Sequence, residues 1–138
     1  MRIGIGFDVH AFDKNRPLIL GGMTIPSIVG GLAGHSDADV LVHAIIDAML
    51  GALSLGTIGS FFPDKDPAYK DISSLVLLKR TYAIIQEKGY QLGNCDASLV
   101  MQLPKLLPFV KKIEASIAAC IGVEASQVSC KATTSEKL

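Results

Sequence analysis

The residues in this chain best suited to chemistry are its three histidines, each of which has a carboxylate nearby in the sequence. Asp8 and His10 stand two residues apart in a segment that alternates like a strand, so both side chains point to one face. His43 lies four residues after Asp39 in a predicted helix, and His35 precedes that helix. Imidazole is the commonest metal ligand near neutral pH. Two imidazoles and one carboxylate around an ion, with one position open, form the ligand set of a catalytic zinc site.

Each of these motifs also has a simpler interpretation when it is taken alone. An Asp-x-His pair is more often a turn or a surface pair, His43 could be a core histidine, and Asp39 could be only a helix cap. Asp47, one turn further on, could pair with a nearby polar group or orient His43 from behind. The combination favours the metal site, because all three histidines fall in two clusters that each contain carboxylates.

The bulk composition excludes several classes of protein. The chain has 138 residues, 49% of them hydrophobic, and one domain with its own core is expected. Thirteen Lys and Arg balance thirteen Asp and Glu, so nothing suggests a nucleic-acid or membrane-surface binder. The low charge weakly favours an oligomer. No secretory signal is expected at the start, and the most apolar stretch, residues 40–55, is too short to span a bilayer.

The three cysteines predict free thiols. Cys95, Cys120 and Cys130 are odd in number and lack C-x-x-C spacing, which argues against a disulfide framework and against a cysteine zinc knot. A reducing cytoplasm is therefore expected.

The hydrophobic pattern predicts an α/β chain of the α+β kind, with a mixed sheet and helices packed on one face. Residues 2–12 are predicted to form a strand with Ile3, Ile5, Phe7 and Val9 on its core face, and to form a hairpin with residues 18–20. The glycines on the other face, Gly4 and Gly6, predict a close approach to the backbone there. The remaining elements are expected to be a helix capped by Ser36 that ends near Leu53, a helix capped by Ser73 that ends at Lys88-Gly89, a strand over 94–103, a helix over 104–121 and a strand over 128–134.

Three polar segments could contribute to a site or could be ordinary surface. The loop Phe62–Pro67 could be a mobile cover, or only a surface loop. The helix start at Leu103-Pro104-Lys105 could bind an anion through its N–H groups, or merely begin the helix. The hydroxyls and carboxylate of residues 131–137 could hold phosphate oxygens or a hard cation, or could be a polar chain end.

Taken in order and with their spacing, these motifs resemble the 2-C-methyl-D-erythritol 2,4-cyclodiphosphate synthase family over essentially the whole chain. The matching stretches are residues 6–10, residues 35–40 with His43, Phe62-Pro63-Asp64, Pro104-Lys105, and residues 131–138. The resemblance implies that the 2-phosphate of 4-diphosphocytidyl-2-C-methyl-D-erythritol 2-phosphate attacks the β-phosphorus of its own diphosphate. The products would be the cyclic diphosphate and CMP, in non-mevalonate isoprenoid biosynthesis. It also implies a homotrimer with active sites between neighbouring subunits.

The resemblance also implies roles for individual residues. Asp8, His10 and His43 match zinc ligands, and Glu136 matches a ligand of a second ion, Mg²⁺ or Mn²⁺. His35 and Thr134 match the pair that stabilises the transition state. The residues expected to contact substrate are Asp8, Val9, His10, His35, Ser36, Thr57, Ile58, Gly59, Phe62, Pro63, Asp64, Lys65, Asp66, Met101, Gln102, Leu103, Pro104, Lys105, Leu106, Leu107, Thr133, Thr134, Ser135 and Glu136, with residues 101–107 and Thr133 around the cytidine moiety.

General chemistry agrees with this reaction. Nucleophile and electrophile belong to one molecule, so positioning supplies much of the acceleration and no protein nucleophile is required. Two cations and fixed hydrogen-bond donors would gather the phosphates and stabilise the charge on the leaving CMP.

The chain departs from the family pattern in two places. Thr57 stands where the family usually has an aspartate that contacts the erythritol hydroxyls. The family also continues beyond the position of Leu138 with a Gly-rich, basic loop and one more strand, so residues 1–138 are expected to form a single domain without that C-terminal strand.

Two other functions remain open at this point. One is a zinc phosphoester hydrolase that uses His35 or Asp39 as a general base, and the other is a trimeric binding scaffold with structural zinc. The cyclising enzyme is preferred because residues 133–136 have no role in either alternative. A bacterial cytoplasm is the expected location, although a processed plastid form would look the same.

Overall fold

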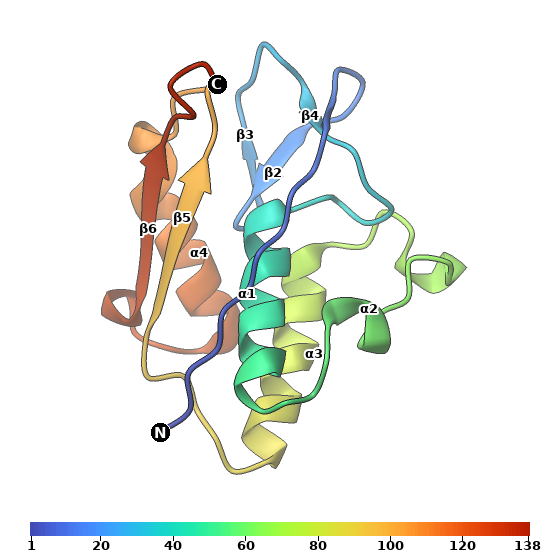
Figure 1. Cartoon of the computed structure of the whole chain (residues 1–138), viewed down its shortest axis with the longest axis vertical. Coiled ribbons are helices and arrows are strands. Elements are labelled where there is room, and N and C mark those ends of the chain that lie inside the picture. The colour runs from blue at the N-terminus through green and yellow to red at the C-terminus, as the bar shows by residue number, and fades with distance from the viewer.

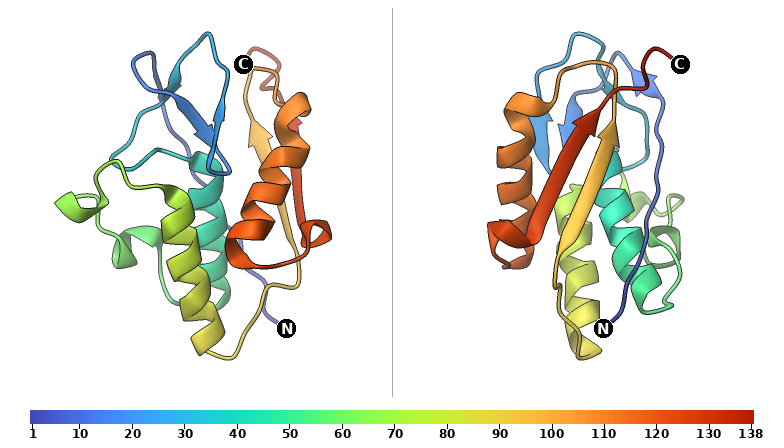
Figure 2. Two further views of the ribbon diagram at one scale, coloured as in Figure 1. Left: turned by 180° about the vertical axis from the view of Figure 1, so that it is seen from behind. Right: turned by 60° about the vertical axis from the view of Figure 1, so that its left-hand side comes forward.

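The computed structural model describes residues 1–138 and arranges them around one central helix, α1 (Val40–Ala52). This helix packs against α3 (Ser74–Glu87), which in turn contacts α4 (Val110–Ile121). The strands β5 (Cys95–Val100) and β6 (Val128–Thr133) form a parallel pair, and α4 packs on β6 (Figure 1). Figure 2 shows that α4 covers one face of this pair of strands, while the N-terminal segment lies on the side of α1 away from α3. The chain is therefore an α+β domain, as expected.

The N-terminal third adds two short antiparallel pairs to this frame. β1 (Phe12–Asp13) pairs with β4 (Gly31–Leu32), and β2 (Leu18–Leu20) pairs with β3 (Met23–Ile25). The turn between β2 and β3 is Gly21-Gly22, with φ values of +60° and +74°, which suit glycine in a tight hairpin. Parallel and antiparallel pairing are thus both present, but they belong to three separate two-stranded sheets and not to one mixed sheet.

The expected strand over residues 2–12 is the main error in the sequence-based prediction. Residues 1–11 run along α1 without a strand partner, and β2 pairs with β3 instead. The predicted core face is outward, with Ile3 83%, Ile5 90% and Phe7 83% exposed. A Cβ at Gly6 would stand 1.8 Å from the carbonyl oxygen of Ala44 in α1, so only glycine permits this approach. The close approach predicted from the glycines is confirmed, and it makes their face the inward one.

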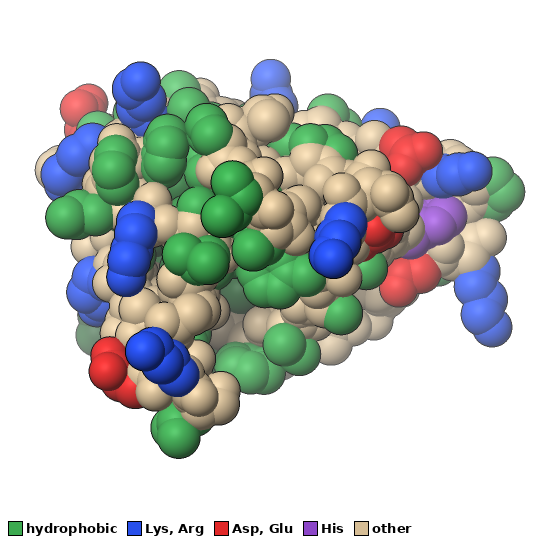
Figure 3. All heavy atoms as spheres, turned by 90° about the horizontal axis from the view of Figure 1, so that it is seen from above, with side chains coloured by type: hydrophobic (Ala, Val, Ile, Leu, Met, Phe, Trp, Pro, Cys, Tyr) green, Lys and Arg blue, Asp and Glu red, His purple; other side chains and the backbone are tan.

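A groove of about 1100 Å³ lies between the N-terminal segment, α1 and β5, and hydrophobic side chains form most of its wall. Asp8, Val9 and His10 border it on one side, and Val100 and Met101 border it on the other. Figure 3 shows the molecule from above the view of Figure 1, and hydrophobic side chains cover a large part of the face seen there.

The helix boundaries follow backbone conformation more closely than the expected caps. Ala38 has φ +56°, so α1 cannot begin at Ser36 and its N-cap is Asp39. α3 starts after Ser73 as expected, although the Ser73 side chain makes no capping hydrogen bond. Gly122, at φ +70°, ends α4 as expected, but α4 begins only at Val110 after a 3₁₀ turn over Leu107–Phe109.

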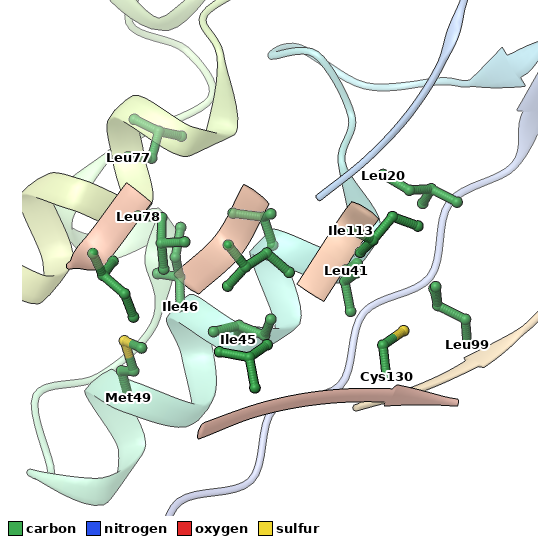
Figure 4. Close-up of a cluster of buried hydrophobic side chains, with 14 of the residues drawn as sticks. Leu20, Leu41, Ile45, Ile46, Met49, Leu77, Leu78, Leu99, Ile113 and Cys130 are labelled. Atoms are coloured by element: carbon green, nitrogen blue, oxygen red, sulfur yellow. The ribbon is translucent and has the colours of Figure 1, made fainter. Parts of the chain in front are cut away.

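The core lies where α1, α3, α4 and the β5–β6 pair meet. Twenty-five buried hydrophobic residues form one cluster, in which Ile46, Leu78 and Ile113 are fully enclosed. Figure 4 shows Ile45 and Ile46 of α1 among side chains that come from the other helices and strands. Because α1 lies in the middle of this cluster, its first turns give a rigid support for polar groups at the edge.

Two shorter elements lie between α1 and α3, and a 3₁₀ turn over Ala125–Gln127 precedes β6. α2 (Ile58–Phe61) and a 3₁₀ turn over Pro67–Tyr69 interrupt the predicted loop between α1 and α3. Phe62, within that loop, is buried and meets Tyr69 edge to face at 5.6 Å. The three cysteines are free, and no helix has the length and hydropathy needed to cross a bilayer.

Candidate active site

Asp8, His10 and His43 form one compact group at the edge of the core, and we call it the triad. Asp8 and His10 share the face of the N-terminal segment that carries Gly6, so that face turns them toward α1, where His43 lies in the first turns. His10 Nε2 lies 2.9 Å from Asp8 Oδ2, and His43 Nδ1 lies 3.2 Å from the same oxygen. The two imidazole nitrogens are 3.4 Å apart.

These separations match the shape of a metal site. Ligands at ordinary zinc bond lengths around a tetrahedral ion are about 3.3 Å from one another. The triad supplies one ligand atom from each residue, all within 4.8 Å of one another, and three ligands leave one tetrahedral position open. The exposed fraction of the side chain is 26% for Asp8, 16% for His10 and 12% for His43. The sequence-based prediction that these three residues meet is confirmed.

The hydrogen bonds behind the rings indicate which nitrogens face the site. His10 Nδ1 is 2.5 Å from the carbonyl oxygen of Ala33, which can only accept, so Nδ1 carries the proton and Nε2 faces Asp8. His43 Nε2 lies 2.9 Å from the hydroxyl oxygen of Ser74 and 3.2 Å from that of Ser36, which leaves Nδ1 toward the triad. Metal-binding imidazoles in proteins are usually held in this way.

The Asp8 carboxylate is held in its charged form. Partial burial raises the pKa of Asp8. When the imidazoles are protonated, a hydrogen bond from His43, the charge of His10 and the Val9 N–H together outweigh burial and leave the pKa below its ordinary value. The lowered pKa keeps Asp8 ionised near neutral pH, as a metal ligand must be.

Two carboxylates on α1 that could have joined the site serve other purposes. Asp39 caps α1 by accepting the Val42 N–H at 3.1 Å and also accepts the Gly22 N–H at 2.7 Å. Burial raises the pKa of Asp39 to about 6, even though these hydrogen bonds act in the opposite direction. Asp47 accepts the Ile58 N–H at 2.6 Å, so the interpretation that Asp47 orients His43 is wrong.

His35 stands on a loop between Gly34, which lies against the His10 ring, and Ser36, which contacts His43. His35 Nε2 lies 3.1 Å from the carbonyl oxygen of Asp66, which places the Phe62–Asp66 loop next to it. The Arg16 guanidinium donates to the carbonyl oxygens of Gly34 and Ser36, on either side of His35. Sequence reasoning missed Arg16, because nothing in its local sequence shows that the turn between β1 and β2 places it here.

A second group of predicted residues gathers at the carboxyl ends of β5 and β6. The Met101 N–H donates to the carbonyl oxygen of Thr133 at 2.9 Å. Thr134 Oγ1 donates to Glu136 Oε1 at 2.8 Å, and the Lys137 N–H reaches Gln102 Oε1 at 3.4 Å. The structure thus brings residues 101–102 together with residues 133–136. No hydrogen bond or ion pair joins this group to the triad.

The other predicted contact residues lie on α2, on the loop that follows it and on the segment after β5. Thr57, Ile58 and Gly59 begin α2, whose position is fixed through Asp47, and Thr57 is exposed at the N-cap. Residues 63–66 are exposed. In the segment after β5, Leu106 is buried, whereas Leu103 and Leu107 are exposed.

A single α+β domain whose triad leaves one metal position open, beside polar loops, defines the class of a candidate metal-dependent enzyme. Comparison with known proteins makes this specific. The YgbB family model matches residues 1–138. The chain is 54% identical over 138 residues to the 2-C-methyl-D-erythritol 2,4-cyclodiphosphate synthase of Prosthecochloris aestuarii, covering 100% of this chain and 87% of that protein. It is 53% identical over 137 residues to the enzyme of the same name from Lysinibacillus sphaericus, covering 99% and 86% of the two chains.

A solved structure of a 2C-methyl-D-erythritol-2,4-cyclodiphosphate synthase in a CDP-bound form has the same fold. The TM-score is 0.92 at 39% identity, with 99% of this chain and 91% of that chain covered. The chain therefore belongs to the YgbB family, the 2-C-methyl-D-erythritol 2,4-cyclodiphosphate synthases. The resemblance found in the sequence motifs is confirmed.

Proposed function

We propose that this chain converts 4-diphosphocytidyl-2-C-methyl-D-erythritol 2-phosphate into 2-C-methyl-D-erythritol 2,4-cyclodiphosphate and CMP. The observation that carries the proposal is the triad, with ligand atoms 2.9–3.4 Å apart, in a chain that matches synthases of this name over its whole length. The reaction is an intramolecular attack of one phosphate on another, so it requires a template and charge stabilisation more than a protein nucleophile.

Zinc is the proposed ion at the triad, because two imidazoles and a carboxylate suit it better than they suit Mg²⁺. Mg²⁺ or Mn²⁺ is proposed at Glu136, whose exposed carboxylate fits a hard cation that also binds phosphate oxygens. When bound, the two ions would polarise phosphoryl oxygens and offset the charge of the diphosphate.

The chain's own residues would fold and hold the substrate. His35 and Thr134 are proposed to donate hydrogen bonds to the phosphates as charge develops. Ser36, Thr57–Gly59 and the Phe62–Asp66 loop would contact the erythritol phosphate part near the triad. Residues 101–107 with residues 133–135 would enclose the cytidine, and the CDP-bound state of the related solved structure supports a cytidine nucleotide as ligand.

A homotrimer with sites between subunits is the proposed assembly. Within one chain, no hydrogen bond or ion pair connects the triad with residues 133–136. A site that needs both groups is therefore more easily completed by residues of a neighbouring copy. The exposed apolar row Ile3, Ile5, Phe7 and Val9 supports burial of surface between copies. Free cysteines and bacterial relatives support a bacterial cytoplasm as the location.

Phosphorus NMR of the purified chain with the diphosphocytidyl substrate tests this function, with and without Zn²⁺ and Mg²⁺. A cyclic diphosphate that appears together with CMP, and is lost with a chelator, is the expected result. CMP with an open-chain phosphate would instead indicate the hydrolase. Binding without turnover, at equal protein concentration and with both metals present, would contradict the enzymatic proposal and favour the scaffold.

A further inference from the structure

On the side turned away from the triad, the His43 imidazole contacts Ser74, and Ser74 in turn contacts Asp37. Neither Ser74 nor Asp37 has a role in the reaction described above. Ser74, the first residue of α3, is fully buried, and its hydroxyl oxygen lies 2.9 Å from His43 Nε2. The same hydroxyl donates to Asp37 Oδ1. The His43 imidazole, the Ser74 hydroxyl and the Asp37 carboxylate therefore form a continuous chain of hydrogen bonds that leads away from the triad.

The direction of these hydrogen bonds follows from the number of protons available. A serine hydroxyl has one proton, and the Asp37 carboxylate can only accept, so the Ser74 proton points to Asp37. The side of Ser74 Oγ that faces His43 is then an acceptor, so Nε2 donates the imidazole proton to Ser74, the nearer of its two hydroxyl partners (Ser74 at 2.9 Å and Ser36 at 3.2 Å). A neutral imidazole protonated at Nε2 has its lone pair on Nδ1, which is the atom 3.2 Å from Asp8 Oδ2.

Asp37 is itself held firmly by backbone groups. Its Oδ2 accepts the Ser74 N–H at 2.8 Å, and its Oδ1 also accepts the Asp39 N–H at 3.2 Å. The Ser74 N–H is one of the donors at the start of α3 that have no partner within the helix, and a carboxylate there is also favoured by the helix dipole. Asp37 thus joins the N-terminus of α3 to the loop that precedes α1.

We propose that Asp37 and Ser74 are positioning residues that fix the Nε2-protonated tautomer and the ring orientation of His43. This inference rests on the proposed metal site, and it replaces the role that the sequence suggested for Asp47. Because the tautomer is set before an ion arrives, the triad presents a lone pair at Nδ1 without rearrangement. Loss of such a partner typically weakens metal binding by 10- to 100-fold.

The test uses Ser74→Ala, which removes the hydroxyl but keeps the backbone N–H that binds Asp37. The matched control is Ser73→Ala, because Ser73 is the adjacent residue, is exposed and makes no side-chain capping bond. Zinc dissociation constants are measured by chelator competition on the full chain. We expect Ser74→Ala to bind zinc at least 10-fold more weakly and Ser73→Ala to match the unmodified chain. Asp37→Asn serves as a second variant and should weaken binding in the same direction.

The tautomer gives two further readouts. In ¹⁵N-labelled unmodified chain, nitrogen–proton NMR should place the His43 ring proton on Nε2. The Co²⁺-loaded Ser74→Ala chain should show visible absorption that differs from that of the Co²⁺-loaded unmodified chain. A proton on Nδ1 would overturn the inference, as would equal zinc affinity in Ser74→Ala. If the unmodified chain binds no zinc, the proposed metal site fails and this inference fails with it; loss of affinity confined to Ser74→Ala and Asp37→Asn supports both.

Discussion

The Asp39 carboxylate accepts the Gly22 backbone N–H at 2.7 Å, so the first turn of α1 is tied to the hairpin turn between β2 and β3. Asp39 is fully buried, and its other oxygen caps α1 through the Val42 N–H. Since His43 lies one helical turn further on, this contact holds the helix that presents the imidazole to the triad.

The free energy of unfolding should depend on the titration of Asp39. Burial raises its pKa from 3.8 to about 6 in the folded state, so the folded chain binds the proton more tightly than the unfolded chain does. Stability from this group is therefore greatest below pH 4 and falls as the pH rises to about 6, by roughly 3 kcal/mol. Urea unfolding between pH 4 and 7 should show this fall in the difference between the unmodified chain and Asp39→Asn.

An exposed carboxylate of the same chain serves as the control for that experiment. Asp64 is exposed and makes no side-chain hydrogen bond, so Asp64→Asn measures the effect of replacing a carboxylate that is not buried. If the Asp39→Asn difference changes with pH no more than the Asp64→Asn difference does, burial does not shift the Asp39 titration.

Metal binding should depend on the triad and not on histidine content in general. His43→Ala removes one of three ligands and should lower zinc affinity by more than the roughly 100-fold expected for a residue behind the ligands. His35→Ala should keep its zinc, because the His35 ring bonds the Asp66 carbonyl and not the triad. Elemental analysis after dialysis against a chelator measures both, and equal zinc loss from the two variants would contradict the assignment.

The glycine face of the N-terminal segment should be intolerant of a methyl group. Gly6→Ala places a Cβ 1.8 Å from the Ala44 carbonyl oxygen, so the segment must move off α1 and carry Asp8 and His10 with it. We expect a loss of about 1–3 kcal/mol in the free energy of unfolding and weaker zinc binding. Gly93→Ala is the matched control, because a Cβ there meets nothing within 4 Å. Unchanged zinc affinity in Gly6→Ala would mean that this approach does not position the ligands.

Glu136 should affect the second ion alone. Glu136→Gln removes the charge that Thr134 Oγ1 contacts at 2.8 Å, and it should raise the Mg²⁺ concentration needed for half-maximal cyclisation by at least about 10-fold. Zinc content should not change, since Glu136 makes no contact with the triad. Glu87→Gln, an exposed carboxylate at the end of α3, should leave both properties as they are. Loss of zinc from Glu136→Gln would contradict two separate sites.

The sequence predicted the parts of this protein that depend on short-range spacing. The i and i+2 relation of Asp8 and His10 placed them on one face, and the glycines after α3 and α4 marked the ends of those helices. The gathering of Asp8 and His10 with His43 was predicted from ligand chemistry, because two imidazoles and one carboxylate form the ligand set of a catalytic zinc site.

The errors came from choices that local pattern leaves open. Alternation in residues 2–12 defines two faces but not which of them turns inward, and the usual rule put Ile3, Ile5 and Phe7 inside. The close approach of Gly6 to α1 reverses that rule: a Cβ there would stand 1.8 Å from the Ala44 carbonyl oxygen, so no larger side chain fits between the two backbones. Helical spacing similarly suggested Asp47 behind His43, whereas Ser74 arrives there from another helix.

By itself, then, the sequence determined the residue types of the site, their local periodicity and the family to which the chain belongs. Tertiary structure decided which face of the N-terminal segment meets α1 and which nitrogen of each imidazole is turned to the triad. It also decided that Arg16 contacts the backbone on either side of His35 and that Ser74 contacts the His43 ring. The physical reason is that backbone propensity and periodicity act over a few residues, whereas hydrogen bonds between side chains such as Ser74 and His43 exist only after packing has brought separate elements within about 3 Å.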